Sequence, residues 1–167
     1  MGYRNKTYVI FDGDKDKWAY AYMKGWKSNE NCDFNFHDAH TLAELGSNAQ
    51  SEDYIKKALR ERFKSAKQVI VLIGESTKGL YRFVKWELEV SLSLDLPIIA
   101  VNLNDKRIMD SDRCPPIIRN TYTVHVPYKM AIIQHALDQF PNEFSRRAVG
   151  SAGPREYNSD VYKNLGI

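Results

Sequence analysis

Two short stretches of uninterrupted apolar residues, QVIVLI at 68–73 and PIIAVN at 97–102, limit most strongly what this chain can fold into. A strand buried on both faces reads as a continuous run of β-branched residues, whereas a strand with one wet face alternates apolar and polar residues. Both faces of a sheet are covered when helices cross over between parallel strands. The two runs therefore predict a parallel sheet with helices on both faces.

The remaining sequence repeats this alternation of strand-like runs and helical patterns. It places strands at residues 6–11, 32–36, 68–73, 97–102 and 122–126, and helices at residues 15–24, 51–65, 79–94 and 129–140. Ser51, which is followed by acidic residues, is expected to cap the second helix. Because crossovers between parallel strands are right-handed, this succession predicts an open five-stranded α/β sheet in the usual order 2-1-3-4-5.

The composition favours a single domain. With 167 residues, of which 43% are hydrophobic, the chain has apolar material for one core but hardly for two. We expect an α/β domain over residues 1–140. The apolar rhythm fades over residues 141–167, which we expect to form a C-terminal extension that is docked or partly flexible.

Cysteines, apolar segments and charge indicate the compartment and limit the partners. Cys32 and Cys114 stand far apart, which suggests neither a disulfide framework nor a zinc site. The chain reaches Asp12 before it could build the apolar segment of a signal peptide, and no later run approaches membrane-spanning length. These features predict a cytoplasmic protein without a membrane partner. The net charge of +3 is spread along the chain and gives no support for nucleic acid binding.

Ligands of open α/β sheets bind beyond the carboxyl ends of the strands, so the residues that follow each strand are the informative ones. The candidates are Phe11 and Asp12 after the first strand, Asp38 and His40 after the second, and the segment 74–77 with Phe83 and Glu87 after the third. We expect all three groups to lie at one edge of the sheet.

Glu87 is the main candidate for a catalytic residue. The helix after the third strand starts at the binding edge, and Glu87 lies in its early turns. Phe83 and Glu87 are spaced i and i+4, so an aromatic ring and a carboxylate share one helix face. We expect this face to be accessible and the stripe of Val84, Leu88 and Ser91 to pack on the sheet. On spacing alone, Glu87 also fits an ordinary solvated helix residue.

The acidic loop after the first strand has two interpretations. Asp12 and Asp14 could bind Mg²⁺, as paired acids do in phospho-receiver domains, or cap the next helix. A receiver also needs an aspartate ending its third strand, where this chain has Gly74 and Glu75. The acidic loop also disfavours a flavin phosphate. His37 and His40 lack a clear third ligand, so no metal site is predicted.

The segments TYVIFDGDKD, FNFHDAH and VIVLIGESTKGLYRFVKWELEVSLSLDLPIIAVNLN resemble the TIR-like domain found in Thoeris antiphage defence systems. The similarity runs from about Lys6 to Phe140. It implies the flavodoxin-like fold of TIR domains. NAD-consuming TIR domains carry a catalytic glutamate in the helix after the third strand, usually four residues after a tryptophan. The matching pair here is Phe83 and Glu87, and Trp86 stands directly before the glutamate.

The resemblance implies an enzyme that cleaves NAD to linear or cyclic ADP-ribose as a signal to a downstream effector protein. NAD is then a substrate, and no cofactor is needed. Losing nicotinamide leaves positive charge on the ribose, which a carboxylate such as Glu87 stabilises. By analogy Phe11, Asp12, Asp38, His40 and Phe83 would bind the substrate. The long polar loop of residues 37–50 suggests self-association.

Two other functions remain open at this point. The same edge and helices could form a non-catalytic TIR-like assembly module. A receiver-like phosphorylation switch is disfavoured by Glu75, although Lys129 lies where a receiver has its lysine. The sequence specifies neither the trigger, nor the effector, nor the product isomer.

Overall fold

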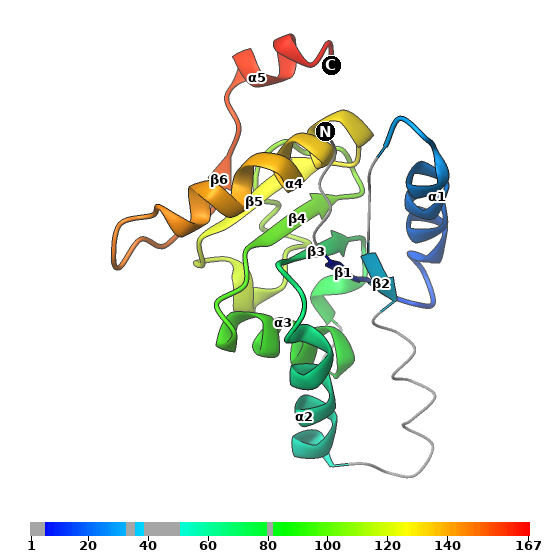
Figure 1. Ribbon diagram of the computed structural model, residues 1–167, viewed down its shortest axis with the longest axis vertical. Helices are drawn as coiled ribbons and strands as arrows, with labels where there is room; N and C mark the ends of the chain where they lie inside the picture. The colour runs from blue at the N-terminus through cyan, green and yellow to red at the C-terminus, as the bar shows by residue number, and fades with distance from the viewer. Residues whose placement is uncertain (1–5, 33–35, 39–50, 80–81) are drawn as a thin grey trace.

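The computed structural model describes residues 6–32, 36–38, 51–79 and 82–167, which form a layered α/β structure (Figure 1). Its strands are β1 (Thr7–Ile10), β2 (Phe36–Asp38), β3 (Gln68–Ile73), β4 (Ile98–Asn102), β5 (Thr123–Pro127) and β6 (Arg155–Glu156). They pair in the order β2-β1-β3-β4-β5-β6, and every pairing is parallel. The predicted α/β class and the order 2-1-3-4-5 are confirmed, and the short β6 extends the sheet beyond β5.

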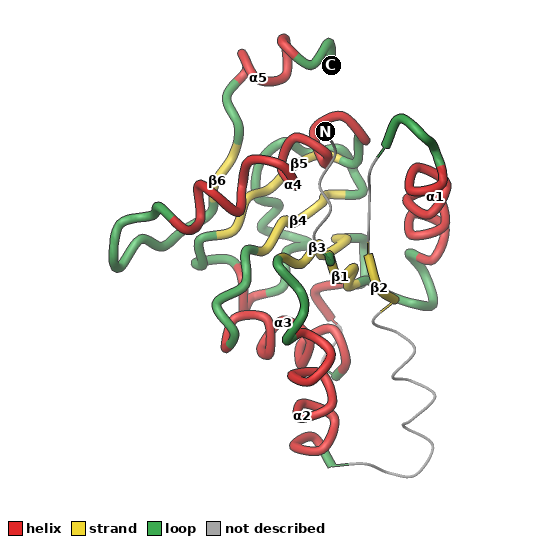
Figure 2. Tube along the Cα trace, viewed as in Figure 1, coloured by secondary structure: helices red, strands yellow, loops and turns green. Residues whose placement is uncertain are grey.

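The two faces of the sheet bury separate apolar clusters. The helices are α1 (Lys17–Ser28), α2 (Glu52–Phe63), α3 (Phe83–Ser93), α4 (Met130–Ser145) and α5 (Ser159–Asn164), with 3₁₀ turns η2 (Thr77–Gly79) and η3 (Pro116–Ile118). Residues of α1, α4 and α5 pack on one face, and residues of α2, α3 and η3 pack on the other. Figure 2 shows α2 and α3 together on one side of the strands, away from α4. The two faces of the sheet are therefore separate environments for side chains.

The central strands follow directly from the apolar runs. All residues of β3 and β4 are buried, and β3 pairs with β1 on one side and β4 on the other. Alternate residues of β3 serve the two clusters: Ile70 and Leu72 face α1 and α4, whereas Val69 and Val71 face α2 and α3. Burial on both faces explains why β3 is apolar throughout except for Gln68 at its start.

The second strand extends beyond its predicted end. The sequence places it at residues 32–36, of which 33–35 lie outside the described residues, and β2 spans Phe36–Asp38. Before it, α1 continues to Ser28 and is closed by a turn in which the Cys32 amide donates to the Asn29 carbonyl at 2.9 Å. Cys32 is buried in the cluster under α1 and so ends the helix connection rather than beginning a strand.

Helix ends differ from the predictions in two places. The connection after β3 first forms the turn η2, so α3 begins at Phe83 rather than at residue 79. Helix α4 continues through Pro141 to Ser145, although proline removes one amide donor. Phe140 and Phe144 are both buried on the core side and hold this last part of α4 on the sheet. At α2 the predicted cap is confirmed, because the Tyr54 amide donates to the Ser51 hydroxyl at 3.2 Å.

The C-terminal residues contribute to the sheet and to the core. Arg155 and Glu156 pair with Val124 and His125 of β5. Tyr162 of α5 is 1% exposed and belongs to the cluster of α1 and α4, with the Arg107 guanidinium 4.0 Å from the centre of its ring. Residues 155–162 thus cover the β5 side of the sheet.

Candidate functional site

The loops that follow β1 and β3 meet at the carboxyl edge of the sheet through the side chain of Asp12. The Ser76 hydroxyl donates to Asp12 Oδ2 at 2.5 Å, and the amides of Asp14 and Lys15 approach Oδ1 at 2.9 and 3.4 Å. Asp12 is only 6% exposed. Both carboxylate oxygens therefore accept hydrogen bonds from the protein and tie the two loops together.

Asp16 forms a second link between the same two loops. Thr77 Oγ1 lies 3.4 Å from Asp16 Oδ2 and accepts a hydrogen bond from the Gly74 amide at 2.8 Å. A Cβ atom on Gly74 would lie 2.4 Å from both carboxylate oxygens of Asp16, so the close approach requires glycine. We call Asp12, Asp16, Gly74, Ser76 and Thr77 the carboxylate clasp. It fixes the start of the connection that leads to α3.

Asp12 and Asp16 differ in their electrostatics although they are neighbours. Burial acts to raise the pKa of Asp12, but hydrogen bonds from Ser76, Asp14 and Lys15 outweigh it, and the pKa lies below its ordinary value. Burial, followed by the negative charge of Asp12, raises the pKa of Asp16, and only the Thr77 hydroxyl and the more distant Arg113 oppose this. Asp12 is the firmly ionised member of the pair.

Helix α3 carries Glu87 on its buried side. The sequence predicts an accessible carboxylate, and this expectation is wrong: Glu87 is 2% exposed. The physical reason is that Glu87 lies three residues after Val84 and four before Ser91, on the stripe that faces inward. Helix α2 packs against α3 and widens this buried face. Ser91 donates its hydroxyl to the Glu87 carbonyl at 2.7 Å, one helical turn back. Any chemistry of Glu87 takes place in a largely dehydrated environment.

Phe83 opens α3 and is the accessible member of the predicted pair. Its side chain is 36% exposed, and its ring lies edge-on to Trp86 with the ring centres 5.8 Å apart. Trp86 is partly buried against the α2 and α3 cluster. The first turn of α3 therefore presents an aromatic surface to solvent one turn before the buried carboxylate.

The other predicted substrate-binding residues are placed as follows. Phe11 is buried and stacks on Tyr20 of α1 with ring centres 4.5 Å apart, in the cluster on the face opposite α3. Asp38 is the last residue of β2 rather than a loop residue. His40 lies outside the described residues, as does most of the loop of residues 37–50. The structure brings Asp12 to the edge near the connection to α3.

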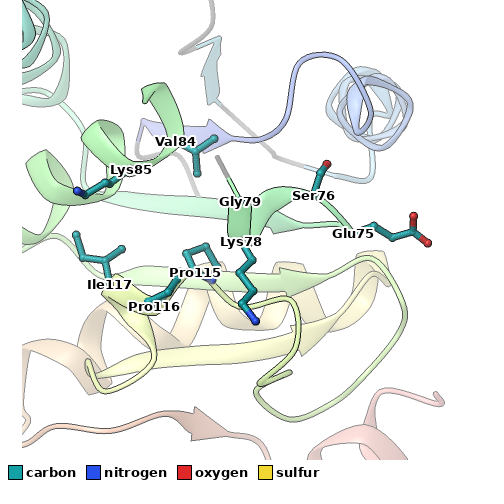
Figure 3. A pocket seen from close by; sticks show the side chains of 9 residues that line it. All are labelled: Glu75, Ser76, Lys78, Gly79, Val84, Lys85, Pro115, Pro116 and Ile117. Atoms are coloured by element: carbon teal, nitrogen blue, oxygen red, sulfur yellow. The ribbon is translucent and has the colours of Figure 1, made fainter. Parts of the chain in front are cut away.

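A cavity of about 670 Å³ lies beside η2 on the α3 face (Figure 3). The described residues that line it are Glu75, Ser76, Lys78, Gly79, Val84, Lys85, Pro115, Pro116 and Ile117. Ser76 belongs both to this lining and to the carboxylate clasp. Glu87 is not among the described lining residues.

The described part of the chain contains neither a metal-ligand cluster nor a membrane-spanning helix. Within residues 6–32, 51–79 and 82–167, no three His, Cys, Asp or Glu side chains gather as metal ligands would. Asp14, one of the two acids considered for Mg²⁺, is exposed, and it is Asp16 that is buried beside Asp12. No helix in the described part has the length and apolar character needed to cross a membrane.

Asp16 was not identified from the sequence, whereas Ser76 and Thr77 lie in the predicted segment 74–77. Asp16 follows Asp12 by four residues in an acidic loop, where it resembles a helix cap. Its partners Gly74 and Thr77 are about sixty residues away. One sequence pattern pointed to this contact: in GESTK at 74–78, a glycine and two hydroxyl residues directly follow a buried strand.

The open parallel sheet, its strand order and the carboxyl edge where the β1 and β3 loops meet define a TIR-like, flavodoxin-like α/β protein. The family model for the TIR-like domain of Thoeris protein ThsB matches residues 8–108, which is more than half of the chain, and the chain therefore belongs to this family. The predicted resemblance is confirmed, and with it a role in Thoeris antiphage defence. Among curated proteins, no match was found.

Proposed function

We propose that this protein cleaves the bond between nicotinamide and ribose in NAD, with Glu87 as the catalytic carboxylate. The observation that carries the proposal is the position of Glu87: a buried carboxylate in the second turn of α3, within the family match and one turn after an accessible aromatic ring. A carboxylate in a poorly solvated site stabilises a nearby positive charge more strongly than one in water.

Cleavage of the nicotinamide–ribose bond requires a negative group beside the ribose and a site that controls where water can approach the sugar. As nicotinamide departs as a neutral base, positive charge develops on the ribose, and the carboxylate of Glu87 stabilises it. Phe83 and Trp86 offer ring faces and edges to the base at the opening of the helix. Asp12, held ionised by Ser76, supplies an acceptor for a ribose hydroxyl in the same region. Water or the adenine of the substrate then completes the reaction and gives linear or cyclic ADP-ribose.

The test is incubation of the purified chain with NAD, followed by chromatography of nicotinamide and the ADP-ribose products. Glu87→Gln should abolish turnover because it removes the charge and keeps the shape. Glu89→Gln is the matched control: it lies two residues from Glu87 on the same helix, is partly exposed and carries ion pairs to Lys56 and Lys85. Normal turnover by Glu87→Gln, or equal loss in both variants, would overturn the assignment.

A downstream effector protein and self-association belong to the same proposal. Activity per molecule should rise with protein concentration if a second copy completes the site. Initial rates measured over a hundredfold concentration range, together with light scattering, test this. Strictly proportional rates from particles of monomer mass would exclude a composite site.

A further inference from the structure

The cavity beside η2 has the size and lining of a small-molecule site. Its volume of about 670 Å³ lies within the range of roughly 300–1,000 Å³ that ligand pockets occupy. One wall is apolar and rigid, made by the rings of Pro115 and Pro116 with Ile117, and Val84 of α3 lies opposite. Such walls suit a flat apolar body.

The charges around the cavity leave one positive group unbalanced. The Glu75 carboxylate lies 3.5 Å from Arg113 Nη2, and the Lys85 amine lies 3.7 Å from the Glu89 carboxylate. Lys78 forms no ion pair among the described residues. The first turn of α3, which includes Val84 and Lys85, adds the positive end of the helix dipole, and its N-cap Arg82 makes no capping hydrogen bond with its side chain. An occupant of this cavity gains from carrying a negative charge.

Ser76 connects the cavity to the binding edge. It lines the cavity, while its hydroxyl donates to Asp12 Oδ2. A molecule that contacts Ser76 is therefore one hydrogen bond away from the carboxylate clasp. The proline wall at 115–117 lies beyond residue 108, where the family match ends, so this cavity is built partly from residues outside that match.

We propose that this cavity is a second ligand site, separate from Glu87, for a small amphipathic anion: an aromatic ring system that carries one phosphate or carboxylate group. The ring packs between Val84 and the wall of Pro115, Pro116 and Ile117. The anionic group lies beside the Lys78 amine. The proposal does not depend on NAD cleavage.

Binding of 1-naphthyl phosphate to the full chain tests the site, with calorimetry for affinity and amide NMR shifts for location. We expect saturable binding with shifts at residues 76–79 and 115–117. The neutral 1-naphthol should bind at least tenfold more weakly. 1-Naphthoate distinguishes the anions: equal affinity identifies any negative group, and weaker affinity identifies a phosphate site.

Two variants and their controls make the test decisive. Lys78→Gln should weaken binding of 1-naphthyl phosphate about tenfold, whereas Lys57→Gln, at an exposed lysine of α2, should leave it unchanged. Gly79→Leu fills the cavity, and an added Cβ there meets no atom within 4 Å; Gly25→Leu in α1 has equal room and is its control.

Wild-type affinity in both Lys78→Gln and Gly79→Leu, shifts confined to other residues, or equal binding of 1-naphthol would overturn the proposal. Competitive displacement by NAD would also overturn it, because the cavity would then belong to the dinucleotide site.

Discussion

The carboxylate clasp and His125 are both buried polar groups at the same sheet, but they differ in the hydrogen bonds that their surroundings offer. The clasp lies at the carboxyl edge, where amides and hydroxyls of two loops reach the oxygens of Asp12 and Asp16. His125 lies inside β5, paired in register with Ala100 and Glu156, and neither ring nitrogen has a hydrogen-bond partner among the described residues.

The difference lies in what each group does when the pH changes. Hydrogen bonds keep the pKa of Asp12 low, so its charge is part of the folded structure. Burial alone lowers the pKa of His125 to about 4, so the folded structure holds its imidazole neutral. Polar burial at the edge joins two loops, whereas polar burial in the strand makes folding sensitive to acid.

Among changes to the buried polar groups, the largest effect is expected from breaking the clasp at its closest contact. Gly74→Ala places a methyl group 2.4 Å from both Asp16 carboxylate oxygens, which must then move within a buried site. Overpacking of this kind costs about 1–3 kcal/mol, and we expect the free energy of unfolding to fall by about 3 kcal/mol. Urea denaturation measures it. Gly79→Ala, where an added Cβ meets nothing within 4 Å, is the control; similar losses in both would show that the Asp16 contact is unimportant.

Acid should act through His125. Because its folded pKa of about 4 lies below the ordinary 6.5, the unfolded chain binds the proton first as the pH falls from 6.5. Neutral His125 therefore contributes fully to the free energy of unfolding above pH 6.5, and this contribution declines as the pH falls from 6.5 to 4. Between pH 7 and pH 5 the free energy of unfolding should fall by about 2 kcal/mol.

Unfolding curves of the wild type and His125→Phe at pH 7 and pH 5 isolate this contribution. The variant keeps an aromatic ring and removes the titrating nitrogens. From pH 7 to pH 5, its free energy of unfolding should therefore fall by about 2 kcal/mol less than that of the wild type. Parallel pH profiles for the two proteins would assign the acid sensitivity to other groups.

A smaller effect is expected from removing one donor of the clasp. Ser76→Ala leaves Asp12 Oδ2 without its hydroxyl donor, while the amides of Asp14 and Lys15 remain on Oδ1. A buried acceptor that loses its partner costs about 1–3 kcal/mol, and we expect a value near the lower limit because Asp12 keeps its other partners. The Asp12 pKa should rise at the same time, which carboxyl NMR titration detects. An unchanged Asp12 titration would contradict the role of Ser76.

The sequence predicts those parts of the molecule whose signal is local. The runs 68–73 and 97–102 give β3 and β4 nearly to the residue, because burial on both faces leaves only apolar side chains. The predicted start of β2 at Cys32 was wrong, because Cys32 instead packs in the cluster under α1. Asp16 escaped notice since its partners at Gly74 and Thr77 lie about sixty residues away along the chain. The burial of Glu87 was readable from its spacing to Val84 and Ser91, but a charged residue is ordinarily assigned to the surface.

The smallest effect on stability, and the sharpest contrast between packing and binding, is expected at Phe83. Its ring is 36% exposed at the start of α3, so Phe83→Ala should lower the free energy of unfolding by about 1 kcal/mol or less. Phe63→Ala is the contrasting variant: that ring is 1% exposed, lies 4.3 Å from the ring of Tyr8, and should cost about 3–5 kcal/mol. If Phe83 contacts NAD as proposed, Phe83→Ala should raise KM for NAD several-fold, since it removes a ring that binds substrate without touching the carboxylate. Thermal unfolding and initial-rate kinetics on both variants separate the two roles. A large loss of stability in Phe83→Ala with unchanged kinetics would place Phe83 in the core and move the nicotinamide pocket elsewhere.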